Sequence, residues 1–173
     1  MEKGNSAKLP QKGVYTLIIK VAKEIRIRIG SLGLQKFRKG YYAYTGSALG
    51  ASATSLKNRV RRHLRKAGKK KRWHIDFLLA DEHVQIETII AASTSQKKEC
   101  EINKKVKKVL KAEALVPKFG ASDCKNKCVS HLLYLGGNSG KKAIEKIYVE
   151  IAGEALVIDP DKLYFPKTRK FHG

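Results

Sequence analysis

Cysteine is scarce in this sequence, and long apolar runs are missing from it. Three of the 173 residues are cysteine, an odd number too small for a disulfide framework, so we expect a reducing, cytoplasmic setting. No apolar run approaches the roughly 20 residues that cross a bilayer, and no charged-then-apolar leader opens the chain. We therefore expect no membrane span and no secretory signal and, without a heptad pattern, a monomer.

Acidic residues are also few. The chain has 37 Lys and Arg against 15 Asp and Glu, a formal charge of +22, and residues 25–75 contain no acidic residue. Basic residues are densest in 57–72 and recur in 97–111, which predicts a polyanionic partner. A solvated face or an anionic membrane would also account for such runs. Interleaving with His63, Trp73 and a tyrosine-rich strand favours nucleic acid. The basic residues that we expect to contact it are Lys57, Arg61, Arg62, Arg65, Lys69, Lys70, Lys71 and Arg72.

Apolar residues make up 42% of the chain, enough for one core. We expect a flexible N-terminus (1–11), one domain (12–138) and a C-terminal extension with a basic tail (139–173). Apolar patterns predict strands at 14–21, 25–29, 41–45, 84–92 and 131–135, with the first two paired as a hairpin and a loop at 30–40. One or two further strands are expected within 144–158. Helices are expected at 55–66, around 73–80 and at 96–110, the last with a capping box formed by Ser93 and Gln96. This order predicts an α+β fold in which helices pack on a small, mostly antiparallel sheet.

The helix expected from Ser55 has an apolar stripe formed by Leu56, Val60, Leu64 and Ala67. Two polar side chains, Arg59 and His63, lie four residues apart on the shoulder of this stripe. A side chain at that position can stay half-buried and still reach into a cleft. The alternative is that Arg59 only extends its charge to solvent and His63 packs at the core edge.

The second long helix has a carboxylate on its apolar face. Ile102, Val106, Val109 and Leu110 define that face, and the side chain of Glu99 projects in the same arc, whereas Glu101 points away. A buried carboxylate is destabilising unless it is paired, hydrogen-bonded or bound to a metal. Glu99 is therefore a candidate site residue. Its place near the helix start, where a carboxylate favours the helix dipole, is the alternative explanation.

Several short motifs occur in an order that resembles the GIY-YIG nuclease superfamily. Gly13-Val14-Tyr15 opens the first strand, Tyr44-Thr45-Gly46 closes a later one, and the Arg-x-x-x-His helix and the helix with Glu99 follow. The stretches YYAYTGSA, WHIDFLL and FGASDC...C..HL (residues 119–132) are similar to the Uri-type branch of that superfamily, whose members occur alone or fused to an endonuclease-III-like DNA repair domain. Val14 and Thr45 replace the isoleucines of the superfamily name, and the spacing between the two tyrosines is unusually long.

This resemblance implies a metal-dependent endonuclease that hydrolyses phosphodiester bonds in DNA, in repair or processing. Tyr15 and Tyr44 match the motif tyrosines, and one of them, Tyr15 in preference to Tyr44, would accept a proton from the attacking water, directly or through a metal-bound hydroxide. Arg59 would bind the scissile phosphate, His63 would contact phosphate or relay a proton, and Glu99 would hold one Mg²⁺ or Mn²⁺. A non-catalytic nucleic-acid-binding module on the same scaffold, or an RNA-associated basic protein, would need the same basic surface.

Two residues of the WHIDFLL stretch, His74 and Asp76, are candidates for lining the cleft, although packing and helix capping would explain both. A further set of residues has the spacing of a metal site. Cys124, Cys128 and His131, joined by Cys100, would complete a closed tetrahedral zinc site. The alternative is that these cysteines are ordinary buried free thiols.

Overall fold

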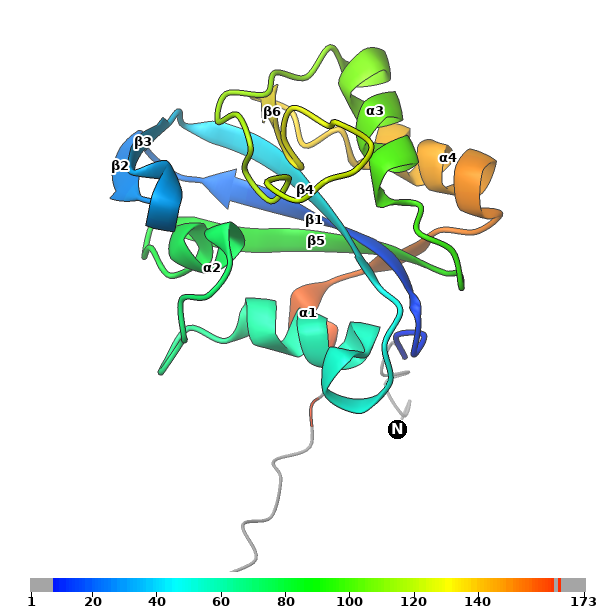
Figure 1. Cartoon of the computed structure of the whole chain (residues 1–173). Helices are drawn as coiled ribbons and strands as arrows, with labels where there is room; N and C mark the ends of the chain where they lie inside the picture. The colour runs from blue at the N-terminus through cyan, green and yellow to red at the C-terminus, as the bar shows by residue number, and fades with distance from the viewer. Residues whose placement is uncertain (1–7, 164, 166–173) are drawn as a thin grey trace, which may run out of the picture.

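The central feature of the structure, a computed structural model describing residues 8–163 and 165, is an antiparallel five-stranded sheet (Figure 1). Its strand order is β6-β4-β1-β5-β7, and each neighbouring pair is antiparallel. These strands are β1 (Gly13–Val21), β4 (Gly40–Ala48), β5 (Val84–Ser93), β6 (Leu132–Gly136) and β7 (Leu156–Ile158). A second sheet pairs β2 (Ile25–Arg28) with β3 (Leu34–Phe37). The expected α+β fold is confirmed.

Helices cover both faces of the large sheet. Helices α1 (Leu56–Leu64) and α2 (His74–Leu79) lie on one face, and α3 (Glu99–Leu110) and α4 (Lys141–Ala152) lie on the other (Figure 1). Alternate residues of the central strand β1 therefore serve two cores. Tyr15 and Leu17 pack in the core that contains α1 and α2, whereas Val14 and Ile18 pack in the core that contains α3 and α4. Burial on both faces explains why β1 is almost continuously apolar.

Helix α1 begins as its sequence predicts. The Ser55 hydroxyl accepts a hydrogen bond from the backbone N–H of Asn58, which satisfies one of the free donors at the helix start. Leu56 and Val60 are completely buried, as expected. The helix ends at Leu64, so the prediction was wrong for Ala67, which lies beyond the helix and is exposed.

The expected hairpin between β1 and β2 was wrong. β1 pairs along its whole length with β4 on one edge and β5 on the other, and both of these strands are longer than β2. No edge of β1 is therefore left for β2. Strand β2 pairs instead with β3, which forms within the segment 30–40 that was expected to be a loop. Gly33, with φ of 72°, provides the left-handed backbone conformation that turns the chain into β3.

The strands expected within 144–158 are replaced for most of their length by helix α4. Ile144, Ile147 and Tyr148 are its buried residues, and their spacing of three and four is that of one helix face. Only β7 is a strand, and it extends the large sheet beside β5. The segment after residue 138 thus contributes a helix and a strand to the same packed structure.

Helix α3 starts three residues later than expected. It begins at Glu99, and its N-cap residue Lys98 makes no side-chain capping bond, so the expected box of Ser93 and Gln96 is not the helix start. Val109 was expected in the core but is 49% exposed, whereas Ile102 and Val106 are buried.

Within the described ranges, no helix is both long and apolar enough to cross a membrane. The predictions for residues 1–7 and for most of the basic tail lie outside the described residues.

Candidate functional site

The two motif tyrosines lie side by side on the face of the sheet that α1 covers. Tyr15 on β1 is directly opposite Gly46 on β4, and Tyr44 is the diagonal neighbour on the same face. Gly46 leaves the space that the Tyr15 phenol occupies, because a Cβ atom at this position would lie 2.8 Å from the phenol oxygen. Gly120, with φ of +64°, approaches the Tyr44 ring in the same way.

Helix α1 delivers Arg59 and His63 to these tyrosines. The Tyr15 hydroxyl and His63 Nε2 are 2.7 Å apart, and both side chains are buried. Arg59 Nη1 donates to the Ser47 carbonyl at 2.6 Å, which holds the guanidinium beside the end of β4. Arg59 and His63 therefore lie where they were predicted, on the shoulder of the apolar stripe of this helix.

Glu99 reaches the same region from the opposite layer. It is the first residue of α3, and its carboxylate accepts a hydrogen bond from the Ser47 hydroxyl at the end of β4. Glu99 is half-buried, not enclosed in the core, whereas Glu101 is exposed. The predicted contrast between the two glutamates is thus present, but Glu99 faces a cleft instead of the apolar interior.

These side chains line two adjoining hollows, which together we call the β4 cleft. Tyr15, Tyr44 and Arg59 line a hollow of about 420 Å³, and Tyr44, Arg59 and Glu99 line one of about 800 Å³. The cleft opens here because β6 pairs with β4 only as far as Tyr44, although β4 continues to Ala48. Groups from β1, β4, α1 and α3 therefore converge on one space.

Burial makes both phenols harder to ionise. Burial raises the pKa of Tyr15 well above its ordinary value, with the Tyr44 phenol adding to the shift and the positive charge of Arg59 opposing it. Burial likewise raises the pKa of Tyr44 to about 12, again opposed by Arg59. Arg59 is thus the side chain that counteracts burial at both hydroxyls.

His63 is neutral in the folded protein. Burial, with the neighbouring charge of Lys69, lowers the pKa of His63 from 6.5 to about 3. Its Nδ1 atom has no hydrogen-bond partner among the described residues. We assign the tautomer with hydrogen on Nε2, because a buried acceptor without a partner is less unfavourable than a buried N–H without one. In this tautomer His63 donates to Tyr15, and the hydroxyl hydrogen of Tyr15 is available to the cleft.

The shifted pKa of His63 predicts a loss of stability in acid. Between pH 6.5 and about 3 the unfolded chain protonates this ring and the folded chain does not, so stability falls as the pH decreases. The loss from pH 6.5 to 4 is expected to be on the order of 3 kcal/mol. Urea denaturation at the two pH values should show this difference in wild type and a smaller one in His63→Gln. His83→Gln is the control, and an unchanged pH dependence in His63→Gln would contradict the prediction.

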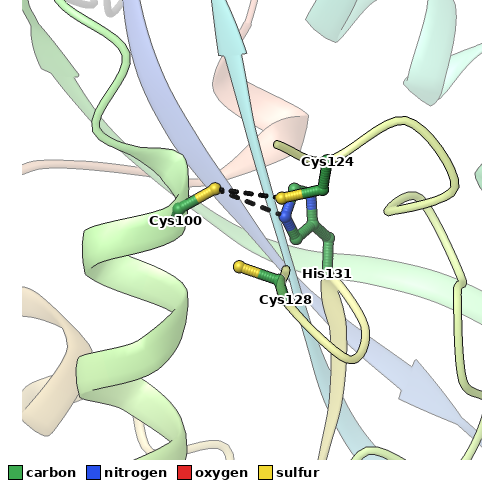
Figure 2. A group of neighbouring side chains, drawn as sticks. All are labelled: Cys100, Cys124, Cys128 and His131. Atoms are coloured by element: carbon green, nitrogen blue, oxygen red, sulfur yellow. Dashed lines mark hydrogen bonds between the residues drawn. The ribbon is translucent and has the colours of Figure 1, made fainter. Parts of the chain in front are cut away.

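A second cluster of chemically reactive side chains lies in the wall of the larger hollow, which Cys100, Cys124 and His131 line. Cys100 on α3 is joined by three residues of the segment between α3 and β6, and we call the four the Cys₃His cluster: Cys100, Cys124, Cys128 and His131. Their ligand atoms all lie within 4.8 Å of one another. The sulfur atoms and the imidazole turn toward a common centre (Figure 2). The cluster can hold a metal ion, and the combination of thiolates with imidazole fits structural zinc.

Comparison with known proteins identifies the family. A family model described as "Domain of unknown function DUF123" matches residues 14–152. The chain belongs to the DUF123 family. The matched range runs from β1 to α4. It contains the whole Cys₃His cluster and four residues of the cleft, Tyr15, Tyr44, Arg59 and Glu99. No curated protein and no solved structure matches the chain.

The eight basic residues that were predicted to contact nucleic acid fall into three groups in this DUF123 domain. Arg62 donates to Asp76 at 2.7 Å, and Lys69 donates to the backbone carbonyls of Arg62, His63 and Arg65, so both cations have internal partners. Arg61 is half-buried, and its guanidinium lies 5.8 Å from the centroid of the Phe165 ring. The exposed members are Lys57, Arg65, Lys70, Lys71 and Arg72.

Asp76 is a structural residue in this arrangement, and His74 lines the cleft. The Asp76 carboxylate is fully buried and accepts hydrogen bonds from Arg62 and from the backbone N–H groups of Arg72 and Trp73. Burial opposes ionisation, yet these bonds lower the pKa of Asp76 below its ordinary value. Asp76 therefore caps α2 and anchors α1. His74 Nδ1 accepts from the backbone N–H of Gly120, and burial lowers the pKa of His74.

Sequence analysis did not assign several other residues of the DUF123 domain to the cleft. Asp123 lines both hollows, Lys97 lines the larger one, and Ser47 binds both Arg59 and Glu99. Two guanidinium groups lie over the Trp73 ring: that of Arg62 is 4.0 Å from the ring centroid, and that of Arg59 is 5.0 Å from it. Asp123 lies within the FGASDC stretch, so that motif was the one available pointer to it.

Proposed function

We propose that this DUF123 domain is a metal-dependent endonuclease of the GIY-YIG type that hydrolyses phosphodiester bonds in DNA. The supporting observation is the convergence of Tyr15, Tyr44, Arg59 and Glu99 on the β4 cleft. Motif order and helical periodicity select the same four groups from the sequence alone. The resemblance to a branch that includes fusions to a DNA repair domain favours DNA over RNA.

Arg59 is the phosphate-binding group of the proposed enzyme. Its guanidinium lines both hollows, so a phosphate in either one lies within its reach. The bond from Nη1 to the Ser47 carbonyl and the contact with Trp73 fix its orientation, which leaves other N–H groups for substrate. A fixed planar fork stabilises the charge that develops on a phosphodiester in the transition state without reorganisation.

Tyr15 and His63 form the proton-handling pair. The phenol lines the cleft, and the imidazole fixes its oxygen from behind at 2.7 Å. In the assigned tautomer, His63 donates to the phenol oxygen and so stabilises the phenolate that accepts a proton from the attacking water. Burial raises the pKa of Tyr15, which limits the phenolate fraction at neutral pH unless a further cation lies nearby.

Glu99 is suited to hold that cation. Its carboxylate is half-exposed in the larger hollow, where Asp123 offers a second carboxylate. Oxygen donors of this kind are the ligands that Mg²⁺ and Mn²⁺ prefer, and one or two carboxylates with substrate phosphate suffice for Mg²⁺. When bound, such an ion supplies Lewis-acid stabilisation of the phosphoryl oxygens and acidifies bound water. The Ser47 hydroxyl orients Glu99 toward this role.

The decisive experiment is a cleavage assay on a panel of nucleic acids. Labelled duplex, single-stranded and branched DNA and a matched RNA are incubated with the protein in Mg²⁺, in Mn²⁺ and in EDTA. We expect cleavage of at least one DNA substrate that depends on the metal. Binding is measured on the same substrates by fluorescence anisotropy in EDTA.

Each alternative function has its own outcome in this assay. Binding to all substrates without cleavage would contradict the nuclease proposal and support a non-catalytic binding module, because the exposed cations alone account for phosphate affinity. Metal-dependent cleavage confined to RNA would contradict the choice of DNA and leave the catalytic assignment in place.

A further inference from the structure

The Cys₃His cluster has the dimensions of a tetrahedral metal site. A zinc ion with Zn–S bonds of about 2.3 Å and a Zn–N bond of about 2.05 Å separates its sulfur ligands by about 3.8 Å and sulfur from nitrogen by about 3.6 Å. Cys100 Sγ is 3.5 Å from Cys124 Sγ and 3.7 Å from His131 Nε2. These two distances match the spacing around a bound zinc, and all four ligand atoms lie within 4.8 Å of one another.

Disulfide formation does not explain the cluster. A sulfur–sulfur bond is about 2.05 Å long, well below the 3.5 Å between Cys100 and Cys124. Three thiols cannot all be paired, and an imidazole in contact with them has no part in a disulfide. All three cysteines of the chain gather here, although Cys100 is on α3 and the other two are in the segment that precedes β6.

Apart from the cluster, turn hydrogen bonds hold the segment, and it has almost no apolar core of its own. Between Phe119 and Ser130 it contains no helix or strand, and Ala121 is its only buried residue. Lys127 adopts a left-handed backbone conformation with φ of 54°, which is unfavourable for a lysine. One buried alanine contributes too little apolar contact to order such a loop. A metal link is one means of ordering a segment that lacks a core.

We propose that the Cys₃His cluster binds one structural Zn²⁺ ion, which ties the segment 120–131 to the first turn of α3. Three thiolates and a neutral imidazole around Zn²⁺ carry a net charge of −1, which the basic surroundings offset. The lysines nearest in sequence to the ligands are Lys97, Lys98, Lys104, Lys125 and Lys127. Lys104 also bridges the two parts of the site, since its ammonium donates to the Asn126 carbonyl at 3.2 Å.

The same ion would position the proposed catalytic cleft, an inference that rests on the proposed function. Cys100 directly follows Glu99, and both residues line the larger hollow. Gly120 and Asp123, on the segment that the metal holds, line both hollows. The zinc link therefore fixes the distance between Glu99 and the opposite wall, while the ion itself stays outside the reaction.

Metal analysis tests the site directly. The full chain is purified without chelators or a metal-affinity tag, and its zinc content is measured by mass spectrometry. We expect one zinc per chain in wild type and in Ser122→Ala, an exposed control in the same segment, and loss of zinc in Cys128→Ser. Cobalt added to the stripped wild-type protein should give the visible absorption of a tetrahedral thiolate site, a readout that requires no variant.

Limited proteolysis tests the structural role. Removal of zinc from wild type should accelerate cleavage after Lys125 and Lys127 by about tenfold or more, because the segment opens more often. The proposed site would be overturned if the wild-type protein contained no zinc and gave no tetrahedral cobalt spectrum. It would also be overturned if Cys128→Ser kept its full zinc content. A cleavage rate unchanged by zinc removal would overturn its role in ordering the segment. None of these readouts depends on nuclease activity, so failure of the proposed function would be seen separately.

Discussion

Replacement of Glu99 by glutamine is expected to lower metal-dependent cleavage by about 100- to 1000-fold and to leave DNA affinity in EDTA nearly unchanged. Glutamine keeps the shape of the side chain and an acceptor for the Ser47 hydroxyl, but it removes the charge that binds a divalent cation. The loss therefore reports on metal binding and not on packing. The measurement is the single-turnover rate across a Mn²⁺ titration, together with anisotropy.

Glu101→Gln is the matched control, because it removes the same charge two residues away from an exposed position on the same helix. We expect it to retain the wild-type rate. Equal losses in both variants would show that the net charge of α3 matters and that Glu99 is not a ligand. An active Glu99→Gln protein would shift the metal assignment to Asp123, the other carboxylate that lines the larger hollow.

The part of the site that lies on regular elements follows from the sequence. Helical periodicity puts Arg59 and His63 on one shoulder of α1, and strand alternation puts Tyr15 on the face that α1 covers, because both patterns are local geometry. Contact between the helix and the strand needs only that the two apolar faces pack together. Glu99 was selected for the same reason, although it borders the core instead of entering it.

The part of the site that lies on irregular segments does not follow from the sequence. The position of Asp123 is set by tertiary contacts of the segment before β6, such as the Asn103 amide donating to the Ser130 carbonyl. Ser47 can bind Glu99 because β4 extends beyond the end of its partner β6, and this extension depends on strand register. Neither feature leaves a periodic pattern.

The errors in the prediction of the fold have a similar origin. Residues 144–158 contain many β-branched side chains, which favour strands, but the spacing of Ile144, Ile147 and Tyr148 lets helix α4 bury them together. In this helix the Tyr148 hydroxyl also lies within hydrogen-bond distance of the Thr16 hydroxyl, at 2.7 Å. Tertiary packing thus overrode local propensity.

Arg59→Ala is expected to reduce the cleavage rate constant by about 100- to 1000-fold and to have a smaller effect on affinity. Its guanidinium lines both hollows between Tyr44 and Glu99, so its contribution should be greatest when charge develops on the phosphate. Arg59→Lys should recover only part of the rate, because an ammonium keeps the charge but not the planar pair of donors. Thermal denaturation of each variant tests whether the lost contacts with Ser47 and Trp73 affect folding.

Arg65→Ala separates this effect from general phosphate affinity. Arg65 is exposed immediately after α1, so its removal should weaken binding by a few-fold, lower the salt slope by about one phosphate contact and leave the rate constant of bound substrate unchanged. A lower rate in Arg59→Ala and a lower affinity in Arg65→Ala would mean that catalysis and general DNA binding are carried by different arginines of this region. Arg59 would then face the reacting phosphate, and Arg65 would face the other phosphates of the DNA. Equal losses of affinity with no change in rate would contradict the catalytic role of Arg59 and reduce α1 to a basic binding surface.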